Sequence, residues 1–230
     1  MYTEDLYHGS NRSRGQEVIS EQKMKITTGD AHWLGDGSYL FTEDFQSYKW
    51  IRDMFKSRHG HKEINYSNIN INYLILECKI ETKKARVLDL TKSEHKILFD
   101  KVRKKMVEMN KIVSADVTEG VTLNYMFNEL GFKDEFDLVK AIFILNQKHY
   151  KDFKSRLAFL PQEQICIKNP EVVKAIEEFN FESKVDLYEG ILKDYYYSSG
   201  SPKETSSYRA RRSESNKGNT SYKRASGRIN

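Results

Sequence analysis

Apolar residues gather in short runs along the first 180 residues, and the spacing within these runs predicts both strands and helices. The run at residues 73–80 is almost entirely apolar, which is typical of a strand that is buried on both faces. Shorter runs bounded by turn residues predict further strands. These lie at residues 5–10, 35–42, 85–90 and 164–167.

Other segments place apolar residues three or four positions apart, which is the period of an α-helix. In residues 43–57, Phe45, Tyr48 and Ile51 follow this period, and Thr42 is suited to cap the helix. Asn followed by Pro at residues 169–170 is a strong start signal for another helix. The predicted helices lie at residues 43–57, 91–113, 122–130, 134–150 and 169–178.

The longest of these helices begins with the sequence Thr-Lys-Ser-Glu at residues 91–94, which fits a capping box. Its apolar residues repeat at helical spacing, and we expect them to point into the core. They are Ile97, Leu98, Val102, Met106 and Met109. Residues 11–15 and 58–70 are polar and are predicted as turn and loop.

Strands and helices follow one another without a regular βαβ rhythm, which favours an α+β fold over a doubly wound sheet. The chain of 230 residues is long enough to bury a substantial core. Residues 198–230 lack apolar periodicity and are rich in Ser, Lys, Arg, Gly and Asn, so we expect a disordered tail. The predicted organisation is therefore one domain at residues 1–197 and a tail at residues 198–230.

Charge is concentrated in this tail. The whole chain has a net charge of +5, whereas residues 198–230 hold eight Lys and Arg and two Glu, a net charge of +6, which leaves −1 for residues 1–197. Two interpretations stay open. The tail is either a solvated end or a phosphate-binding arm for RNA or DNA, since Tyr208, Arg209, Tyr222 and Arg224 interleave aromatic rings with cations.

The expected compartment is the cytoplasm. No apolar run approaches 18 residues, and the acidic start at residues 1–5 lacks an apolar h-region, so neither a transmembrane helix nor a secretory signal is predicted. Cys78 and Cys166 lie in apolar runs and are expected to be buried free thiols. His59 and His61 lack a third ligand nearby, so no metal site is predicted.

Three short motifs carry the candidate chemistry. Residues 6–10 read Leu-Tyr-His-Gly-Ser, residues 35–39 read Gly-Asp-Gly-Ser-Tyr, and residues 162–167 read Gln-Glu-Gln-Ile-Cys-Ile. In this order they resemble the motifs of the ADP-ribosyltransferase superfamily, in the branch with a His–Tyr–Glu signature that includes diphtheria toxin and the poly(ADP-ribose) polymerases. The resemblance covers about residues 5–178, and it is to small bacterial members, many of them toxins or phage-defence effectors.

The resemblance implies a split β-sandwich with flanking helices around a cleft for NAD, which would be the substrate. His8 would donate to a ribose hydroxyl, with Ser10 beside it, and Gly9 would offer its backbone to the nicotinamide carboxamide. Tyr39 would stack on the nicotinamide ring. Glu163 would stabilise the positive charge that develops on the ribose as the glycosidic bond breaks.

Two positions on the predicted helix at residues 43–57 agree with this resemblance. Counting on from Tyr39, Ser47 falls where the family places a hydroxyl on the carboxamide, and Trp50 falls where it often places a second stacking aromatic residue. Residues three apart on one helix share a face. Because nicotinamide is a flat ring with a carboxamide, it needs both aromatic faces and a hydrogen-bonding group.

The register of the third motif stays open. Glu163 and Gln164 are neighbours on a predicted strand and must point to opposite faces, so a slip of one residue would exchange them. The match to the Glu-x-Ile pattern favours Glu163 as the residue that faces the cleft.

Together, the motifs predict a mono-ADP-ribosyltransferase that cleaves NAD, releases nicotinamide and transfers ADP-ribose to a protein or nucleic-acid acceptor. A role as a toxin or defence effector, with an antitoxin as partner, fits the resemblance. Two alternatives stay open: an NAD glycohydrolase without a specific acceptor, and a catalytically inactive fold that binds nucleic acid through its basic tail.

Overall fold

The computed structural model describes residues 1–29, 32–60, 62–112, 118–143 and 161–197, with side chains described as far as residue 193. The chain divides into two units, Met1–Leu192 and Lys193–Asn230, and the fold below is that of the first unit. The predicted tail at residues 198–230 lies outside the described residues.

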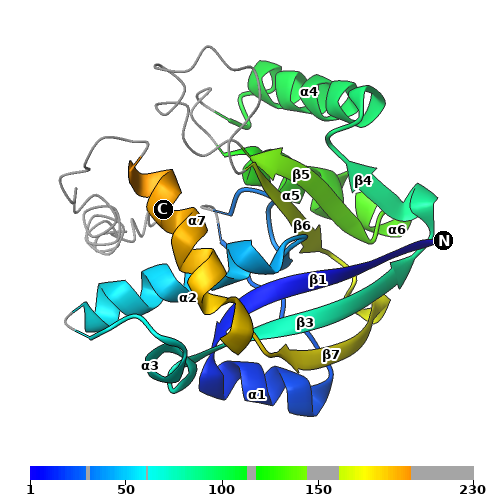
Figure 1. The fold of residues 1–230 in the computed structure, drawn as a ribbon. Coiled ribbons are helices and arrows are strands. Elements are labelled where there is room, and N and C mark those ends of the chain that lie inside the picture. Colours follow the sequence, from blue (N-terminus) through cyan, green and yellow to red (C-terminus); the bar gives the residue numbers. More distant parts are fainter. Residues whose placement is uncertain (30–31, 61, 113–117, 144–160, 198–230) are drawn as a thin grey trace, which may run out of the picture. The chain divides into compact units, whose positions relative to one another are not determined.

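The first unit is built on a seven-stranded mixed sheet with the order β4-β5-β6-β2-β1-β3-β7 (Figure 1). Neighbouring strands are antiparallel, except for the parallel pair β4 and β5. With the helices below, the sheet confirms the predicted α+β class. The strands are β1 Tyr2–Asn11, β2 Ser38–Phe41, β3 Tyr73–Thr82, β4 Val87–Asp89, β5 Leu138–Phe143, β6 Gln162–Ile167 and β7 Val173–Phe179.

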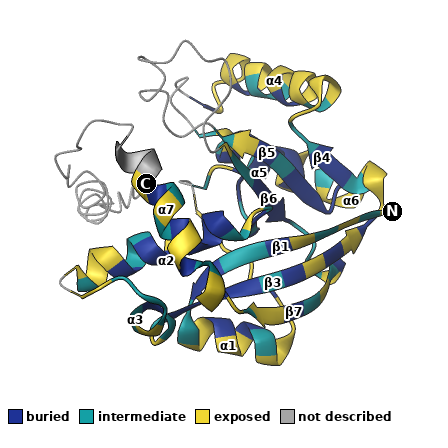
Figure 2. Cartoon of the chain, in the orientation of Figure 1, coloured by how far each residue is buried: buried dark blue, intermediate teal, exposed yellow. Residues whose placement is uncertain are grey.

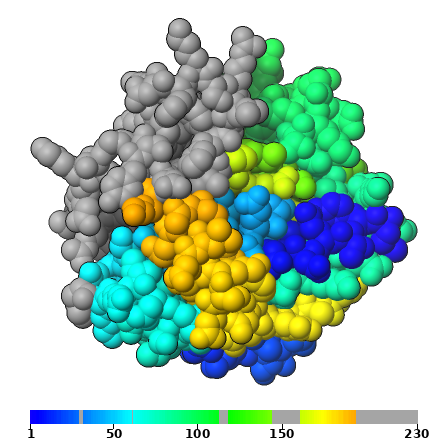
Figure 3. Space-filling model, in the orientation of Figure 1, coloured from blue at the N-terminus to red at the C-terminus, as the bar shows by residue number. Residues whose placement is uncertain are grey.

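Helices cover both halves of this sheet. The helix α1 packs on β3, β1 and β7, α2 packs on β1 and β3, and α4 packs on α5 and β4. In Figure 3, α2 and α7 form neighbouring parts of the surface, and part of β1 is visible beside them. The helices are α1 Arg12–Glu21, α2 Asp44–His59, α3 Tyr66–Asn70, α4 Ser93–Glu108, α5 Glu119–Glu129, α6 Phe132–Glu135 and α7 Val185–Tyr197.

The sheet is weakly joined in its middle, between β1 and β2. The strand β1 pairs with β3 at ten positions, but its pairing with β2 consists of Tyr7 opposite Phe41. If that register continued, Gly9 would lie opposite Tyr39, yet no such pair forms between these two described strands. The sheet therefore opens at the point where the first two motifs meet.

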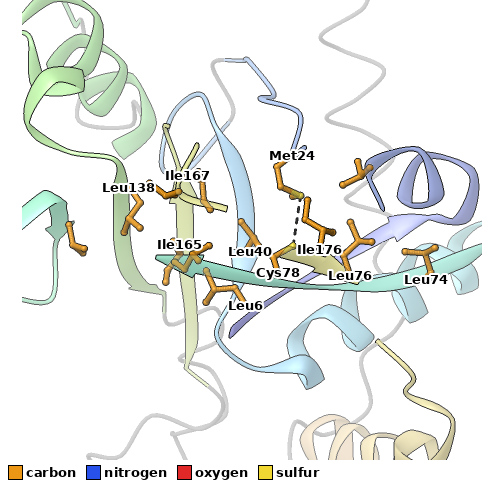
Figure 4. Packing of buried hydrophobic residues seen from close by; sticks show 14 residues of the cluster. Leu6, Met24, Leu40, Leu74, Leu76, Cys78, Leu138, Ile165, Ile167 and Ile176 are labelled. Carbon is orange, nitrogen blue, oxygen red and sulfur yellow. Dashed lines mark hydrogen bonds between the residues drawn. The ribbon is translucent and has the colours of Figure 1, made fainter. Parts of the chain in front are cut away.

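Two hydrophobic cores lie on opposite faces of the sheet, and buried residues line much of β3, β5 and β6, whereas β7 is mostly exposed or half-buried (Figure 2). The first core joins the two halves through Leu6, Leu40, Leu76 and Ile165, and Figure 4 shows these side chains converging. The second core lies between the sheet and α4 and α5. It includes Phe99, Leu123, Met126, Val139 and Cys166.

The predicted helix at residues 134–150 is wrong over most of its described part, because α6 ends at Glu135 and Leu138–Phe143 forms β5. Leu138 enters the first core, whereas Val139 and Ala141 enter the second. A segment that is apolar on both faces satisfies a helical and an extended pattern equally well, so periodicity could not separate the two. Residues 144–150 lie outside the described part of the chain.

Two further predictions fail at helix starts. The predicted turn at residues 11–15 instead begins α1, and the Arg12 backbone N–H donates to the Asn72 carbonyl over 2.8 Å. Asn169 does cap a turn, because its side chain accepts from the Glu171 N–H. That turn is a 3-10 turn of three residues, Pro170–Val172, and the chain then enters β7 rather than a helix.

Helix α4 also differs from its prediction. It begins at Ser93, and the residue in the N-cap position, Lys92, makes no side-chain cap, so the predicted capping box is wrong. Phe99 and Met106 are buried, whereas Ile97, Leu98 and Met109 are exposed.

The predictions for the other helices were closer. The helices predicted at residues 43–57 and 122–130 are confirmed as α2 and α5. Thr42 does not cap α2, because the N-cap position is Glu43, which makes no side-chain cap bond either. The segment at residues 58–70, predicted as loop, includes the end of α2 and the short helix α3.

Candidate functional site

The opening between β1 and β2 is bridged by a side chain. His8 Nδ1 lies 2.6 Å from the main-chain oxygen of Tyr39. Because a carbonyl oxygen only accepts, Nδ1 must carry the hydrogen. Burial is the main cause that lowers the pKa of His8, with a smaller lowering by Arg14, and both outweigh the bond to Tyr39. The ring is therefore neutral near pH 7, and its Nε2 carries a free lone pair.

Gly9 brings helix α2 close to the backbone of β1. A Cβ atom at Gly9 would lie 2.8 Å from Cγ2 of Ile51, 2.9 Å from Cε3 of Trp50 and 3.0 Å from the Ser47 main-chain oxygen. Real Cβ atoms do not approach other atoms this closely, so only glycine fits here without a shift of the helix. The first motif and the α2 residues are thereby in direct contact.

Ser47 and Trp50 occupy different environments on this helix. Ser47 is fully buried, and its Oγ has no hydrogen-bond partner among the described residues. Trp50 is 40% exposed although it packs on Gly9. A buried hydroxyl without a partner costs about 1–3 kcal/mol, so an unpaired group at such a place is typical of a binding site.

Helix α2 is fixed from its outer side by α7. The carboxylate of Glu189 accepts from Arg52 Nη2 over 2.8 Å and from the Tyr48 hydroxyl over 2.8 Å. Arg52 is 7% exposed, so these bonds are shielded from water. This arrangement holds the helix that carries Ser47 and Trp50 against β1.

Tyr39 is held by the loop that precedes it. Its hydroxyl donates to the Gly35 carbonyl over 2.6 Å and accepts from the Leu34 N–H over 2.8 Å. Burial raises the pKa of Tyr39, so the hydroxyl stays protonated. Gly35 has a φ of 73°, a left-handed conformation that favours glycine. The ring of His32 lies beside that of Tyr39, with 5.5 Å between the ring centroids.

Lys168 stabilises this loop through hydrogen bonds to its main chain. Its Nζ donates to the carbonyl oxygens of Leu34, over 2.6 Å, and of Asp36. It also lies 5.1 Å from the centre of the Phe127 ring. Burial lowers the pKa of Lys168. Sequence reasoning missed this residue, because one lysine at the end of a strand gives no signal of a buried role.

Glu163 lies on the same face of the sheet as His8. The cross-strand pairs Tyr7–Phe41 and Phe41–Gln164 put these three side chains on one face, and their strand neighbours therefore point to the other. Gln164 is buried and lies on the face of Tyr7, which by the same alternation is also the face of Gly9 and Tyr39. Glu163 shares the opposite face with His8 alone among the predicted residues His8, Gly9 and Tyr39.

Glu163 is also paired with a lysine. Lys140 Nζ lies 2.9 Å from Glu163 Oε1, and 27% of the Glu163 side chain is exposed. Burial lowers the pKa of Lys140, but the hydrogen bond to Glu163 and the nearby Glu4 and Asp89 outweigh it, so the net pKa is raised. Sequence reasoning missed Lys140 because residues 134–150 were predicted as a helix.

The structure thus brings five predicted site residues, His8, Gly9, Tyr39, Ser47 and Trp50, into direct or near contact. The other two, Ser10 and Glu163, lie on β1 and β6. His8 and Tyr39 are hydrogen-bonded, and Gly9 packs on the segment of Ser47 and Trp50. Ser10 is buried and follows on β1. Glu163 stands two strands away, on β6.

The described residues offer little for other kinds of site. No cluster of three or more His, Cys, Asp or Glu that could hold a metal ion occurs among the described residues. Cys78 and Cys166 are buried free thiols, as predicted. None of the described helices is both long and apolar enough to cross a membrane.

Comparison with known proteins finds a relative in an archaeon. Uncharacterized protein MJ0359 of Methanocaldococcus jannaschii is 34% identical over 210 residues, which cover 82% of this chain and 94% of the relative. No protein-family model matches the chain. No solved structure matches it either.

Proposed function

The chain belongs to the family of Methanocaldococcus jannaschii MJ0359. We propose that this chain is a mono-ADP-ribosyltransferase of the His–Tyr–Glu type. It would bind NAD between β1, β2 and α2, release nicotinamide and transfer ADP-ribose to a macromolecular acceptor. The opening of the sheet between Gly9 and Tyr39 would then correspond to the split of a β-sandwich. The toxin or defence role and the antitoxin partner stay part of this proposal.

The observation that carries the proposal is the unpaired hydroxyl of Ser47. It is fully buried, and its own helix carries the half-exposed ring of Trp50 one turn further on. The carboxamide of nicotinamide both donates and accepts, so it can satisfy this hydroxyl and the backbone of Gly9 together. The aromatic rings of Trp50 and Tyr39 would then bound the nicotinamide ring.

His8 supports the proposal through the direction of its hydrogen bond. With Nδ1 donating to Tyr39, the neutral ring presents Nε2 as an acceptor. It would accept from a ribose hydroxyl of NAD, which reverses the direction expected from the motif alone. The same bond fixes the ring relative to Tyr39, so ribose and nicotinamide would be aligned by one rigid pair.

Glu163 would act on the bond that breaks. The glycosidic bond between ribose C1′ and the nicotinamide nitrogen breaks with its electron pair passing to the nitrogen, which neutralises the pyridinium. The positive charge that develops on the ribose is stabilised by a carboxylate. A lone pair of the acceptor then forms the new bond to C1′, and the acceptor's proton passes to Glu163 or to water. The products are nicotinamide, the ADP-ribosylated acceptor and one proton.

The test is incubation of the full chain with NAD labelled in the adenine and, separately, in the nicotinamide. We expect release of nicotinamide by the wild type, with adenine label on a macromolecule from a lysate. Glu163→Gln should release nicotinamide at least about a hundredfold more slowly, which is the scale of losing one electrostatic group. A matched control is Glu177→Gln, which removes an exposed carboxylate on β7, far along the sheet order from β6. No nicotinamide release by the wild type would refute the proposal.

Product analysis separates transfer from hydrolysis. If the adenine label appears as free ADP-ribose alone, with every lysate fraction supplied as acceptor, the chain is an NAD glycohydrolase. In that case the NAD site stands and the acceptor is water.

A further inference from the structure

A separate cavity of about 590 Å³ lies between the β5 end of the sheet, α4 and the start of α5. This volume is within the range of small-molecule sites, about 300–1,000 Å³, and is large enough for a nucleotide. Its apolar wall consists of Leu34, Phe99, Ala141 and Phe143. None of the residues to which the NAD proposal gives a role lines this cavity.

Partly exposed aromatic rings lie at and beside this wall. Phe143 is half-buried, whereas Phe99 is buried and contributes only to the floor of the wall. Trp33 packs on Phe143, with 4.9 Å between ring centroids, and 37% of Trp33 is exposed. Exposed aromatic rings beside a cavity are the stacking surfaces that single-stranded nucleic acid uses, because every base has a π-face.

The polar part of the lining comes mainly from α4. Lys96, Asp100 and Arg103 line the cavity at a spacing of three to four residues, and Lys96 pairs with Asp100 over 2.5 Å. Glu119, at the start of α5, adds a second carboxylate. Carboxylates accept from the amino and imino groups of bases, and Lys and Arg bind phosphates.

Charge around α4 is unlike that of the rest of the first 197 residues. Residues 92–111 hold seven Lys and Arg against three Asp and Glu, a net charge of +4. Residues 1–197 as a whole have a net charge of −1, so the remainder is acidic. Lys101, Lys104 and Lys105 are exposed on α4 beyond the residues of the cavity. A polyanion would therefore be attracted to this helix rather than to the surface in general.

The cavity borders the candidate NAD site on two sides. Ile142 lines the cavity and is the cross-strand partner of Glu163. Leu34 lines the cavity, and its N–H donates to the hydroxyl of Tyr39. A group that enters the cavity is thus on the second-core face, beside the loop that holds Tyr39, whereas the Glu163 side chain points to the other face of β6.

We propose that this cavity binds one nucleotide of a single-stranded nucleic acid, with neighbouring phosphates along α4, and that this nucleic acid is the acceptor. The acceptor role rests on the proposed transferase activity, whereas the binding does not. In the transfer, a ring or exocyclic nitrogen or oxygen of the base forms the bond to ribose C1′ as nicotinamide leaves. The displaced proton passes to Glu163 or to water.

Binding is tested with the full chain and fluorescein-labelled 12-nucleotide DNA and RNA strands, by anisotropy across a salt series. The variant Lys101→Ser/Lys104→Ser/Lys105→Ser should bind about tenfold more weakly and lower the salt slope by about 2, because each phosphate contact adds about 0.7. Trp33→Ala should weaken binding about fivefold or more. The control Lys23→Ser/Lys79→Ser/Lys133→Ser removes three exposed lysines elsewhere and should change affinity less than twofold.

Crosslinking locates the strand. Oligonucleotides with 4-thiouridine, irradiated and digested, should give adducts on the peptides that contain Trp33, Phe143 or α4. Adducts confined to residues 198–230, or equal loss of affinity in the control variant, would overturn the proposed site.

The acceptor role has its own readout. Glu163→Gln should bind the oligonucleotide as the wild type does, yet leave it unlabelled by NAD. Nicotinamide release with label on protein alone would overturn the nucleic-acid acceptor and leave the transferase. Crosslinks at the cavity without nicotinamide release would overturn the acceptor role and the transferase together, but not the binding site.

Discussion

The imidazole of His8 donates to the main-chain oxygen of Tyr39 over 2.6 Å, at a level of the sheet where β1 and β2 no longer pair. The side chain takes the place of a missing ladder bond, and the two backbones are held apart with a defined spacing. Gly9, the next residue, is where the separated strands would admit a flat ligand. The first two motifs are therefore one structural unit, although 31 residues separate His8 from Tyr39.

Ser47→Ala should separate binding from stability. The Ser47 hydroxyl has no partner among the described residues, so its removal should leave the free energy of unfolding unchanged or slightly higher. If the hydroxyl binds the carboxamide, the KM for NAD should rise about two- to tenfold, since such a hydrogen bond contributes about 0.5–1.5 kcal/mol. Urea unfolding and initial rates of nicotinamide release measure the two effects.

Ser38→Ala is the matched control for that experiment. Ser38 is also buried, but its Oγ donates to the Lys25 carbonyl over 2.9 Å. Its loss should lower the free energy of unfolding by about 1 kcal/mol and leave KM unchanged. The same change in KM in both variants would argue against a carboxamide site at Ser47.

Gly9→Ala should reduce activity strongly without unfolding the chain. The new methyl group would lie within 3.0 Å of Trp50, Ile51 and the Ser47 carbonyl, so α2 must move outward. Overpacking of this kind costs about 1–3 kcal/mol. Nicotinamide release should fall by at least about tenfold, because a displaced helix misaligns its side chains with the ligand.

Gly190→Ala serves as the control for that substitution. A Cβ atom at Gly190, on α7, would meet nothing within 4 Å, and alanine favours a helix over glycine by about 1 kcal/mol. This variant should be as active as the wild type and melt at a higher temperature. Full activity in Gly9→Ala would exclude a close approach of ligand to this backbone.

The pKa of His8 predicts a pH dependence. Burial holds the pKa of His8 below its usual value near 6.5. The folded state thus binds this proton less readily than the unfolded state, so stability is full above about pH 6.5 and declines as the pH falls toward the lowered pKa. His8→Asn can still donate to Tyr39 but does not titrate, so its melting temperature should change less between pH 7.5 and pH 5.

The helix that carries Ser47 and Trp50 was predicted more accurately than the strands around it. The offsets from Tyr39 to Ser47 and Trp50 depend only on local helix geometry, and α2 forms as expected. Whether Glu163 or Gln164 faces the cleft depends on the pairing of three strands, β1, β2 and β6. A single sequence does not contain that register. The pair Phe41–Gln164 supplies it, and it puts Gln164 on the face of Tyr39 and Glu163 on the face of His8.

Failures of prediction have a common cause in residues 134–178. Leu138–Phe143 and Val173–Phe179 were both predicted as helices, and both are strands with partners distant in sequence. Their apolar residues satisfy a helical period, and only pairing with β6 and β3 decides the matter. Lys140 was hidden by this error. Its approach to Glu163 follows from the strand, because Lys140 is paired with Ile165, two residues from Glu163.

Asp137, just before β5, gives a prediction about acid stability. Its carboxylate accepts from Arg86 Nε over 2.7 Å, from the Thr82 hydroxyl over 2.5 Å and from Asn169 Nδ2 over 2.9 Å. The bond from Arg86 is the main cause that lowers the pKa of Asp137 to about 2. These bonds join the start of β5 to Arg86 before β4, to Asn169 after β6 and to Thr82 at the end of β3, so they tie the half of the sheet that carries Glu163 to β3 in the other half.

Because the folded pKa is lowered, the stabilisation is full above the usual carboxyl pKa, about 3.9, and is lost as the pH falls toward 2. Asp137→Asn should therefore lower the free energy of unfolding by about 1–2 kcal/mol at pH 7, allowing for solvent screening on the Arg86 side. The difference from wild type should vanish near pH 2.

Asp100→Asn, which breaks the exposed pair with Lys96, is the control and should change the free energy of unfolding by less than about 0.5 kcal/mol. Urea unfolding at pH 7, 4 and 2.5 measures these differences. If Asp137→Asn lowers the free energy of unfolding equally at all three pH values, the shape of Asp137, rather than its charge, makes it stabilising.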